Sequence, residues 1–386
     1  MIPASAKYPL VIALAVAITV RLVIFIVVAV HPISADSGNL VSPSILNGTD
    51  LPSYLDAKRE FFTGSVEQLV KKFAAYYVSP QKQQEGLIVT APLFPALLLL
   101  FKYDAGNTWP LAGAFLVGGM WLVAMWLRWL VNRGVPLFWL IVFAIVPSPV
   151  YYAMCIGTDL PFSILFALFF LHYMKEVWTR QDIFIWGMAL FLSLLTRPNA
   201  LSILMFVLID LLVLEGHETL KSPWFLLGAT LVVGALGLFY YPYFMTEMHG
   251  ASRKMFFGSS SQEYWGGMFS SVPGWLNILA SWTALCLARI LYFAGLRPSY
   301  SGVSTFFVVM RALPGLILLP GIVYLFWKGE PKEKLLVSAF LLPIVIASSQ
   351  DRYNLPIQPL LFFYGVRALA RAKAQDWVRP GVVKVE

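Results

Sequence analysis

The long apolar run at residues 9–30, which contains a single charged residue, constrains the fold of this chain more than any other feature. A helix over this run would be about 30 Å long, which matches the hydrocarbon core of a bilayer. Many further apolar runs follow, and 59% of the residues are hydrophobic while only 12% are charged. A typical soluble protein carries about twice that charged fraction. The sequence therefore predicts an all-α, multi-pass integral membrane protein.

The basic residues lie in short groups between the apolar runs. The formal net charge of +8 does not indicate a nucleic-acid partner, because these groups form no continuous exposed stripe. Their distribution is typical of cytosolic loops under the positive-inside rule. With the basic groups at Arg128 and Arg133, at Lys175 and Arg180 and at 328–334 placed in the cytosol, both termini are cytosolic and residues 372–386 form a basic tail. The chain then reads as one transmembrane domain, residues 1–386, of about ten spans, with nine to eleven as the range.

Two apolar runs are exceptions to this count. The predicted spans are residues 9–30, 109–131, 136–153, 161–173, 183–195, 201–214, 223–244, 303–327, 335–347 and 355–369. The run at 92–101 would make only about 15 Å of helix, so it is predicted to be interfacial or half-inserted. The run at 275–293 is placed at the outer interface, because counting it as a span reverses all later helices against the charge rule.

Two long polar segments lie outside the membrane in this topology. The first outer loop, residues 36–92, carries a capping-box pattern at Ser65–Gln68 and apolar residues at helical spacing over 66–77. This pattern predicts an amphipathic helix on the membrane surface. The second outer loop covers residues 245–302. Loops of this length between hydrophobic spans usually carry function.

Arg21 lies deep within the first predicted span. A guanidinium facing lipid at that depth is costly. We therefore expect Arg21 to face the bundle interior or a wet cavity, with a carboxylate or phosphate as its partner. An interior salt bridge between two helices is the alternative left open.

Polar residues gather at the predicted outward turns. Asp36, Asp159, Arg197 and Arg352 lie at the outer ends of four separate spans. A carboxylate can deprotonate a hydroxyl, and guanidinium groups bind phosphate bidentately and stabilise it as a leaving group. This combination suits the transfer of a group from a phosphate-linked donor.

Each of these residues also has a purely structural interpretation. Asp159 could cap the helix that begins near Pro161. Arg197 could extend from a helix end toward water, and Arg352 could anchor its helix at the interface. Asp36 could cap a turn in its loop.

Six short motifs occur in an order that resembles the GT-C class of membrane glycosyltransferases. That class includes protein O-mannosyltransferases, GPI-anchor mannosyltransferases and bacterial lipid A aminoarabinose transferases. The matching elements are Asp36 with Gly48, Ala91-Pro92-Leu93-Phe94-Pro95, Ser148-Pro149 followed by two tyrosines, Thr158-Asp159, Leu195-Thr196-Arg197-Pro198 and Arg352-Tyr353-Asn354-Leu355-Pro356. Each element alone is weak, but together they cover nearly the whole chain.

The resemblance implies a GT-C-like bundle that works outside the cytosol. A polyprenyl- or dolichyl-phosphate sugar would donate its glycosyl unit, with inversion, to a hydroxyl of a glycolipid, glycan or protein. Asp36 would be the catalytic carboxylate, and Arg352 and Arg197 would hold the carrier phosphate. The remaining candidate substrate-binding residues are Asp159, Tyr353, Arg253 and Lys254.

The sequence assigns no metal ligand and leaves a divalent metal open as a cofactor. The expected partners are the lipid-linked donor, its acceptor and the bilayer, with no nucleic acid. The expected location is a bacterial inner membrane, or an ER membrane if the chain is eukaryotic. A transporter or flippase for a lipid-linked sugar is the main alternative, although no internal repeat typical of transporters was found. A non-catalytic assembly subunit is the third interpretation.

Overall fold

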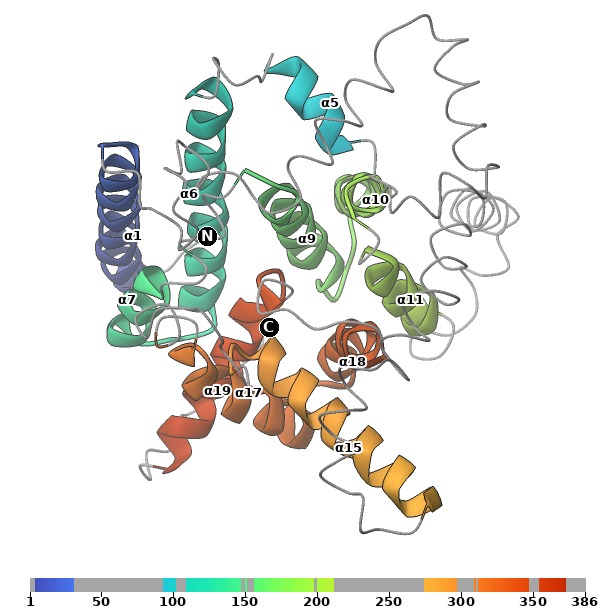
Figure 1. Cartoon of the computed structure of the whole chain (residues 1–386). Coiled ribbons are helices and arrows are strands. Elements are labelled where there is room, and N and C mark those ends of the chain that lie inside the picture. The colour runs from blue at the N-terminus through green and yellow to red at the C-terminus, as the bar shows by residue number, and fades with distance from the viewer. Residues whose placement is uncertain are drawn as a thin grey trace, which may run out of the picture.

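All regular structure in the described part of the chain is helical (Figure 1). The computed structural model describes residues 4–30, 93–101, 109–146, 150, 156–197, 200–211, 274–296, 309, 312–346 and 354–372. Its helices are α1 (Ala4–Val30), α5 (Leu93–Leu100), α6 (Trp109–Asn132), α7 (Leu137–Ile145), α9 (Asp159–Tyr173), α10 (Arg180–Leu194), α11 (Leu201–Ile209), α15 (Gly274–Phe293), α17 (Gly315–Lys328), α18 (Pro331–Ile346) and α19 (Gln358–Ala372). The all-α prediction is confirmed for these ranges.

Two helices of the described ranges are long and apolar enough to cross a membrane. They are α1, over Lys7–Ile26, and α6, over Pro110–Asn132. Helices α9 and α17 are apolar but shorter. Membrane character is therefore supported at two helices. The count of about ten spans and the assignment of each face to a side of the membrane stay predictions.

The short apolar run before α6 forms a short helix, as the sequence predicted. Helix α5 is eight residues long, and its Phe94 ring lies 6.4 Å from that of Phe115 near the start of α6. Helix α7 ends at Ile145, well before the predicted limit at residue 153. Pro147 and Pro149 follow in the sequence and have no N–H to continue the helical hydrogen bonds. The predicted surface helix 66–77 and the predicted span 223–244 lie outside the described residues.

Helices α1, α6 and α7 pack together as one group, to the left in Figure 1. Small residues make the interior face of α1, where Ala13 and Ala17 are fully buried. Beside this group, α17 and α19 form the most extensive helix pair of the described residues, and Phe362 of α19 contacts Phe143 of α7 at 5.2 Å. A Cβ on Gly321 would overlap the carbonyl oxygen of Leu361, and a Cβ on Gly365 would overlap that of Ile317. Two glycines thus allow backbone contact between these helices, as is common in membrane bundles.

Aromatic rings join α6 to the helices on either side of it. The ring of Trp129 lies 5.4 Å from that of Phe170 in α9 and 5.6 Å from that of Phe363 in α19, both edge-on. Phe166 of α9 makes a similar contact with Phe340 of α18, at 5.2 Å. Edge-to-face pairs of this kind add about 0.5–1.5 kcal/mol each beyond area burial. The rings fix the relative positions of α6, α9, α18 and α19.

Charged residues join several helix ends into one cluster, called here the ion-pair end. At the end of α6, Arg133 lies 3.5 Å from Glu333 at the start of α18, and Tyr364 of α19 donates a hydrogen bond to the same carboxylate. Lys332 pairs at 3.1 Å with Asp210, which directly follows α11. These helix ends are ones that the charge pattern assigns to the cytosol. The structure therefore groups ends that the sequence placed on one side.

Candidate functional site

Two of the seven candidate site residues lie in the described part of the chain, and they contact each other. The guanidinium Nη1 of Arg197 donates to Oδ1 of Asp159. The two residues are only 8% and 7% exposed. Asp36, Tyr353 and three basic residues lie outside the described residues, so their roles stay predictions; the three are Arg352, Arg253 and Lys254.

The Asp159–Arg197 pair lies at one end of the hairpin formed by α9 and α10. Asp159 is the first residue of α9, so its charge lies at the positive end of that helix dipole. Arg197 follows the last turn of α10, where a cation is favoured by the negative end of the dipole. Both helix ends therefore favour the charge that they carry. The capping interpretation of Asp159 is wrong, because α9 begins at Asp159 with Thr158 as its N-cap, and the Asp159 carboxylate binds the arginine that follows the neighbouring helix.

Hydrogen bonds of the local backbone hold both charged residues in place. The Ser163 hydroxyl donates to the Asp159 carbonyl oxygen at 2.7 Å. The Thr196 hydroxyl donates to the Leu192 carbonyl at 2.7 Å, and the backbone N–H of Arg197 donates to the carbonyl of Ser193. Pro198 is next in the sequence and cannot extend the helix. The turn that carries Arg197 is thus held at a fixed position.

A third motif meets this turn. The backbone N–H of Leu93, the first residue of α5, donates to the carbonyl of Leu195 at 2.9 Å. Phe94 beside it is fully buried. The element at 91–95, the Thr158-Asp159 element and the Leu195–Pro198 element are therefore neighbours in space, although about 100 residues of sequence separate the first from the last. The burial of both residues lowers the local dielectric and strengthens the electrostatic contact between them.

The last motif packs elsewhere in the described structure. The side-chain Nδ2 of Asn354 donates to the carbonyl of Phe293 at 2.6 Å, at the end of α15. Gly295, two residues after that helix ends, has a φ of 94°, a left-handed conformation that glycine adopts without strain. Leu355 and Gln358 line a small cavity that also contains Arg21. The described part of this motif therefore lies against α15 and α1 instead of the Asp159–Arg197 pair.

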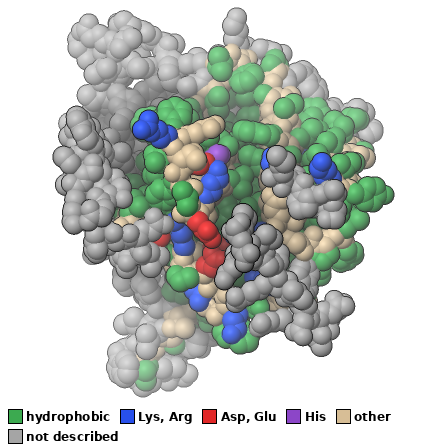
Figure 2. Space-filling model, turned by 180° about the vertical axis from the view of Figure 1, so that it is seen from behind, with side chains coloured by type: hydrophobic (Ala, Val, Ile, Leu, Met, Phe, Trp, Pro, Cys, Tyr) green, Lys and Arg blue, Asp and Glu red, His purple; other side chains and the backbone are tan. Residues whose placement is uncertain are grey.

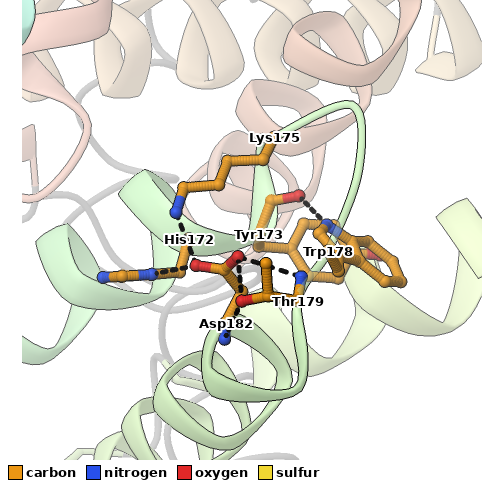
Figure 3. Close-up of polar contacts among 6 residues, drawn as sticks. All are labelled: His172, Tyr173, Lys175, Trp178, Thr179 and Asp182. Atoms are coloured by element: carbon orange, nitrogen blue, oxygen red, sulfur yellow. Dashed lines mark hydrogen bonds and ion pairs between the residues drawn. The ribbon is translucent and has the colours of Figure 1, made fainter. Parts of the chain in front are cut away.

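The opposite end of the α9–α10 hairpin carries a charged cluster that the sequence analysis missed. Asp182 accepts hydrogen bonds from His172 at 2.7 Å and Lys175 at 2.5 Å (Figure 3). Thr179 and Asp182 bond each other reciprocally as a capping box at the start of α10. The pattern Thr179-x-x-Asp182 was visible in the sequence. The charge pattern of the sequence assigns Lys175 and Arg180 only to a cytosolic basic group.

These hydrogen bonds hold the pKa of the Asp182 carboxyl well below its ordinary value, with the bond from Lys175 as the largest cause, followed by those from His172 and Thr179. Asp182 is therefore an ionised structural anchor of the turn between the two helices. Glu333 in the ion-pair end differs, because burial raises its pKa despite the nearby Arg133. Figure 2 shows acidic and basic side chains gathered in a patch on one face, surrounded by hydrophobic residues.

Within the described residues, no group of three His, Cys, Asp or Glu side chains is arranged to hold a metal ion. A divalent metal as cofactor stays a prediction. In comparisons with known proteins, no family model, no curated protein and no solved structure matches this chain.

Proposed function

We propose that this chain is a membrane glycosyltransferase that uses a polyprenyl-phosphate sugar as its donor. The observation that carries the proposal is the meeting of three motif elements at the Asp159–Arg197 pair. Sequence order alone does not require these turns to meet. Their contact supports the idea that these three motifs belong to one site, as the resemblance to GT-C enzymes implies.

In the proposed reaction, an acceptor hydroxyl attacks the anomeric carbon from the side opposite the phosphate. Asp36 takes the hydroxyl proton as the new C–O bond forms. The bond from the anomeric carbon to the phosphate oxygen breaks, and its electron pair leaves with polyprenyl phosphate. The sugar configuration is therefore inverted.

Asp159 and Arg197 have separate roles in this proposal. A guanidinium presents five N–H donors in a rigid plane, so one edge can bond a carboxylate while another faces a phosphate. Asp159 would be a positioning residue that holds the plane of Arg197. Arg352, Tyr353, Arg253 and Lys254 would complete the contacts to the donor or acceptor.

The test is a donor panel with the purified full-length protein in liposomes. Polyprenyl-phosphate sugars that differ in the sugar are supplied with glycolipid and glycan acceptors. We expect one donor to be consumed, with one polyprenyl phosphate released for each glycoside formed and inverted anomeric configuration in the product. A transporter would instead move an intact donor across the bilayer. Transport without cleavage, or cleavage of no donor in the panel, would reject the proposal.

A further inference from the structure

A small cavity lies between α1, α6, α7 and the segment that leads into α19. Its polar lining comes from Arg21, Trp126 and Gln358, and apolar residues such as Phe143 and Leu355 complete it. The cavity has room for about one water-sized group. No member of its lining belongs to the Asp159–Arg197 pair or to the ion-pair end.

Arg21 brings a positive charge to this cavity. The residue is 2% exposed, which confirms the expected interior orientation. Its Nη1 donates to the carbonyls of Ala17 at 3.2 Å and Ala144 at 3.1 Å. Neither the expected carboxylate partner nor an interior salt bridge is found in the described structure, where backbone carbonyls are its partners. A guanidinium stays charged even when buried, so these neutral acceptors compensate it only in part.

Two N–H groups in the lining have no hydrogen-bond partner among the described residues. One is the Nε of Arg21 and the other is the indole Nε1 of Trp126. Trp126 is itself 2% exposed, and its ring packs against Trp129 and Phe170 at centroid distances of 5.8 and 5.3 Å. An indole nitrogen can only donate. A buried donor without an acceptor costs about 1–3 kcal/mol, so the lining favours an added acceptor.

The start of α19 adds a third favourable term. Gln358 is the first residue of this 15-residue helix and lines the cavity together with Pro359. The dipole of this helix favours negative charge at its first residues, while Pro359 has no N–H and the N–H groups of Leu360 and Leu361 already donate to the carbonyl of Ile357. A buried cation, the two side chains that carry the unmet donors and the first residues of a helix therefore line one small space. This combination selects an acceptor with negative charge over a neutral one.

The purely structural role of Arg21 does not use all of these groups. Its bond to Ala144 ties α1 to the last turn of α7. That contact explains Nη1 but leaves both Nε and the indole N–H of Trp126 unexplained.

We propose that this cavity binds one negatively charged acceptor atom, either a halide ion or a single oxygen of a phosphate group whose remainder lies outside. The small volume excludes a whole phosphate and sets the limit of one atom. The inference does not depend on the proposed glycosyltransferase activity. It gives Arg21 an anionic partner of the kind expected from its depth in the first span, and it assigns to Trp126 a binding role that no motif had indicated.

The experiment measures thermal unfolding of the detergent-solubilised full chain as chloride or bromide replaces gluconate at constant ionic strength. Parallel titrations use inorganic phosphate and a short-chain prenyl phosphate. A ligand that binds only the folded state raises the unfolding temperature with concentration, and the titration gives a dissociation constant. The same titrations on Asp36→Asn separate this site from the proposed catalytic one.

We expect an anion-dependent rise in wild type that Arg21→Gln weakens by about 10-fold or more, since a charge-assisted bond is lost. Trp126→Phe keeps the ring packing, removes one neutral donor and should weaken binding by about 5-fold. The matched controls Arg128→Gln and Trp121→Phe change exposed residues of α6, the helix that carries Trp126. Both should bind the anion as wild type does.

The three ligands distinguish the source of the acceptor atom. Binding of halide alone assigns a halide ion, while tighter binding of inorganic phosphate or of the prenyl phosphate assigns a phosphate oxygen from that source. If Arg21→Gln does not fold, the Trp126→Phe and Trp121→Phe pair still decides the question. No anion-dependent shift in wild type, or equal shifts in Trp126→Phe and Trp121→Phe, would overturn the proposal.

Discussion

The two ends of the α9–α10 hairpin carry charged clusters of different construction. At one end, Asp159 and Arg197 pair across the two helices, with both residues almost fully buried. At the other end, Asp182 shares its carboxylate among His172, Lys175 and Thr179 (Figure 3).

The second cluster has a sufficient structural explanation. Its carboxylate caps a helix and closes a short turn, and the Lys175 side chain is 45% exposed, so little desolvation is required of that lysine. A buried ion pair such as Asp159–Arg197 adds little net stability, because the cost of desolvating its two charges can exceed the Coulombic gain. Of the two clusters, the Asp159–Arg197 pair is therefore the better candidate for a functional role.

The largest expected effect separates catalysis from structure. Asp36→Asn should lower sugar transfer by about 100-fold or more, because the general base is lost while the shape is nearly kept. Asp182→Asn, at the opposite end of the α9–α10 hairpin from Asp159, should leave the transfer rate per folded molecule unchanged. Transfer is measured as release of polyprenyl phosphate, and the folded fraction by gel filtration in detergent. Equal losses of transfer rate in Asp36→Asn and Asp182→Asn would contradict the assignment of a catalytic role to Asp36 and a structural role to Asp182.

The next effect concerns the stability of the buried pair. Asp159→Asn or Arg197→Gln leaves one charge buried without its partner, and each should cost about 3–5 kcal/mol of unfolding free energy. The double variant Asp159→Asn/Arg197→Gln removes both charges and should recover most of that loss. Denaturant unfolding in mixed micelles measures all three. Additive losses in the double variant would mean that the two charges do not stabilise each other.

A smaller effect is expected at the capping box. Thr179→Ala removes the side chain that accepts from the Asp182 N–H and should cost about 1 kcal/mol. Thr179→Ser keeps the hydroxyl and serves as the control. Both variants should transfer sugar at the wild-type rate per folded molecule, because the capping box lies at the end of the hairpin opposite the Asp159–Arg197 pair. The same unfolding assay gives the free energies, and a lower transfer rate in Thr179→Ala would contradict the structural assignment.

The smallest effects are pH slopes of opposite sign. The lowered pKa of Asp182 adds stability that is present above its ordinary pKa and lost as pH falls through the folded value. The raised pKa of Glu333 adds stability that is present below its ordinary pKa and lost as pH rises through the folded value.

Unfolding free energies as a function of pH test these slopes. Asp182→Asn should flatten the loss on the acid side, below about pH 4, and Glu333→Gln should remove the loss on the other side. The exposed Glu176→Gln serves as the control for both and should keep the wild-type profile. An acid slope that persists in Asp182→Asn would assign that slope to another group.

The sequence predicted the positions of helices better than it predicted contacts between them. Apolar runs located α1, α6, α9 and α10 to within a few residues, because burial in one helix is a local property. Asp159 and Arg197 were each marked as site candidates, yet no periodicity could show that they meet, since the pair joins residues 38 apart. For Arg21 the interior orientation was expected and the carbonyl partners were not. Any buried acceptor can bind a guanidinium, so the arginine residue alone does not show which acceptors it contacts.

The central claim is that the Asp159–Arg197 pair belongs to a catalytic site and is not only a lock between two helices. The most direct measurement is the sugar-transfer rate of the folded Asp159→Asn/Arg197→Gln double variant, compared with wild type at equal folded concentration. A catalytic site predicts a folded protein whose transfer rate falls by about 10-fold or more, since the oriented guanidinium is gone. A folded double variant that transfers sugar at the wild-type rate would contradict the claim.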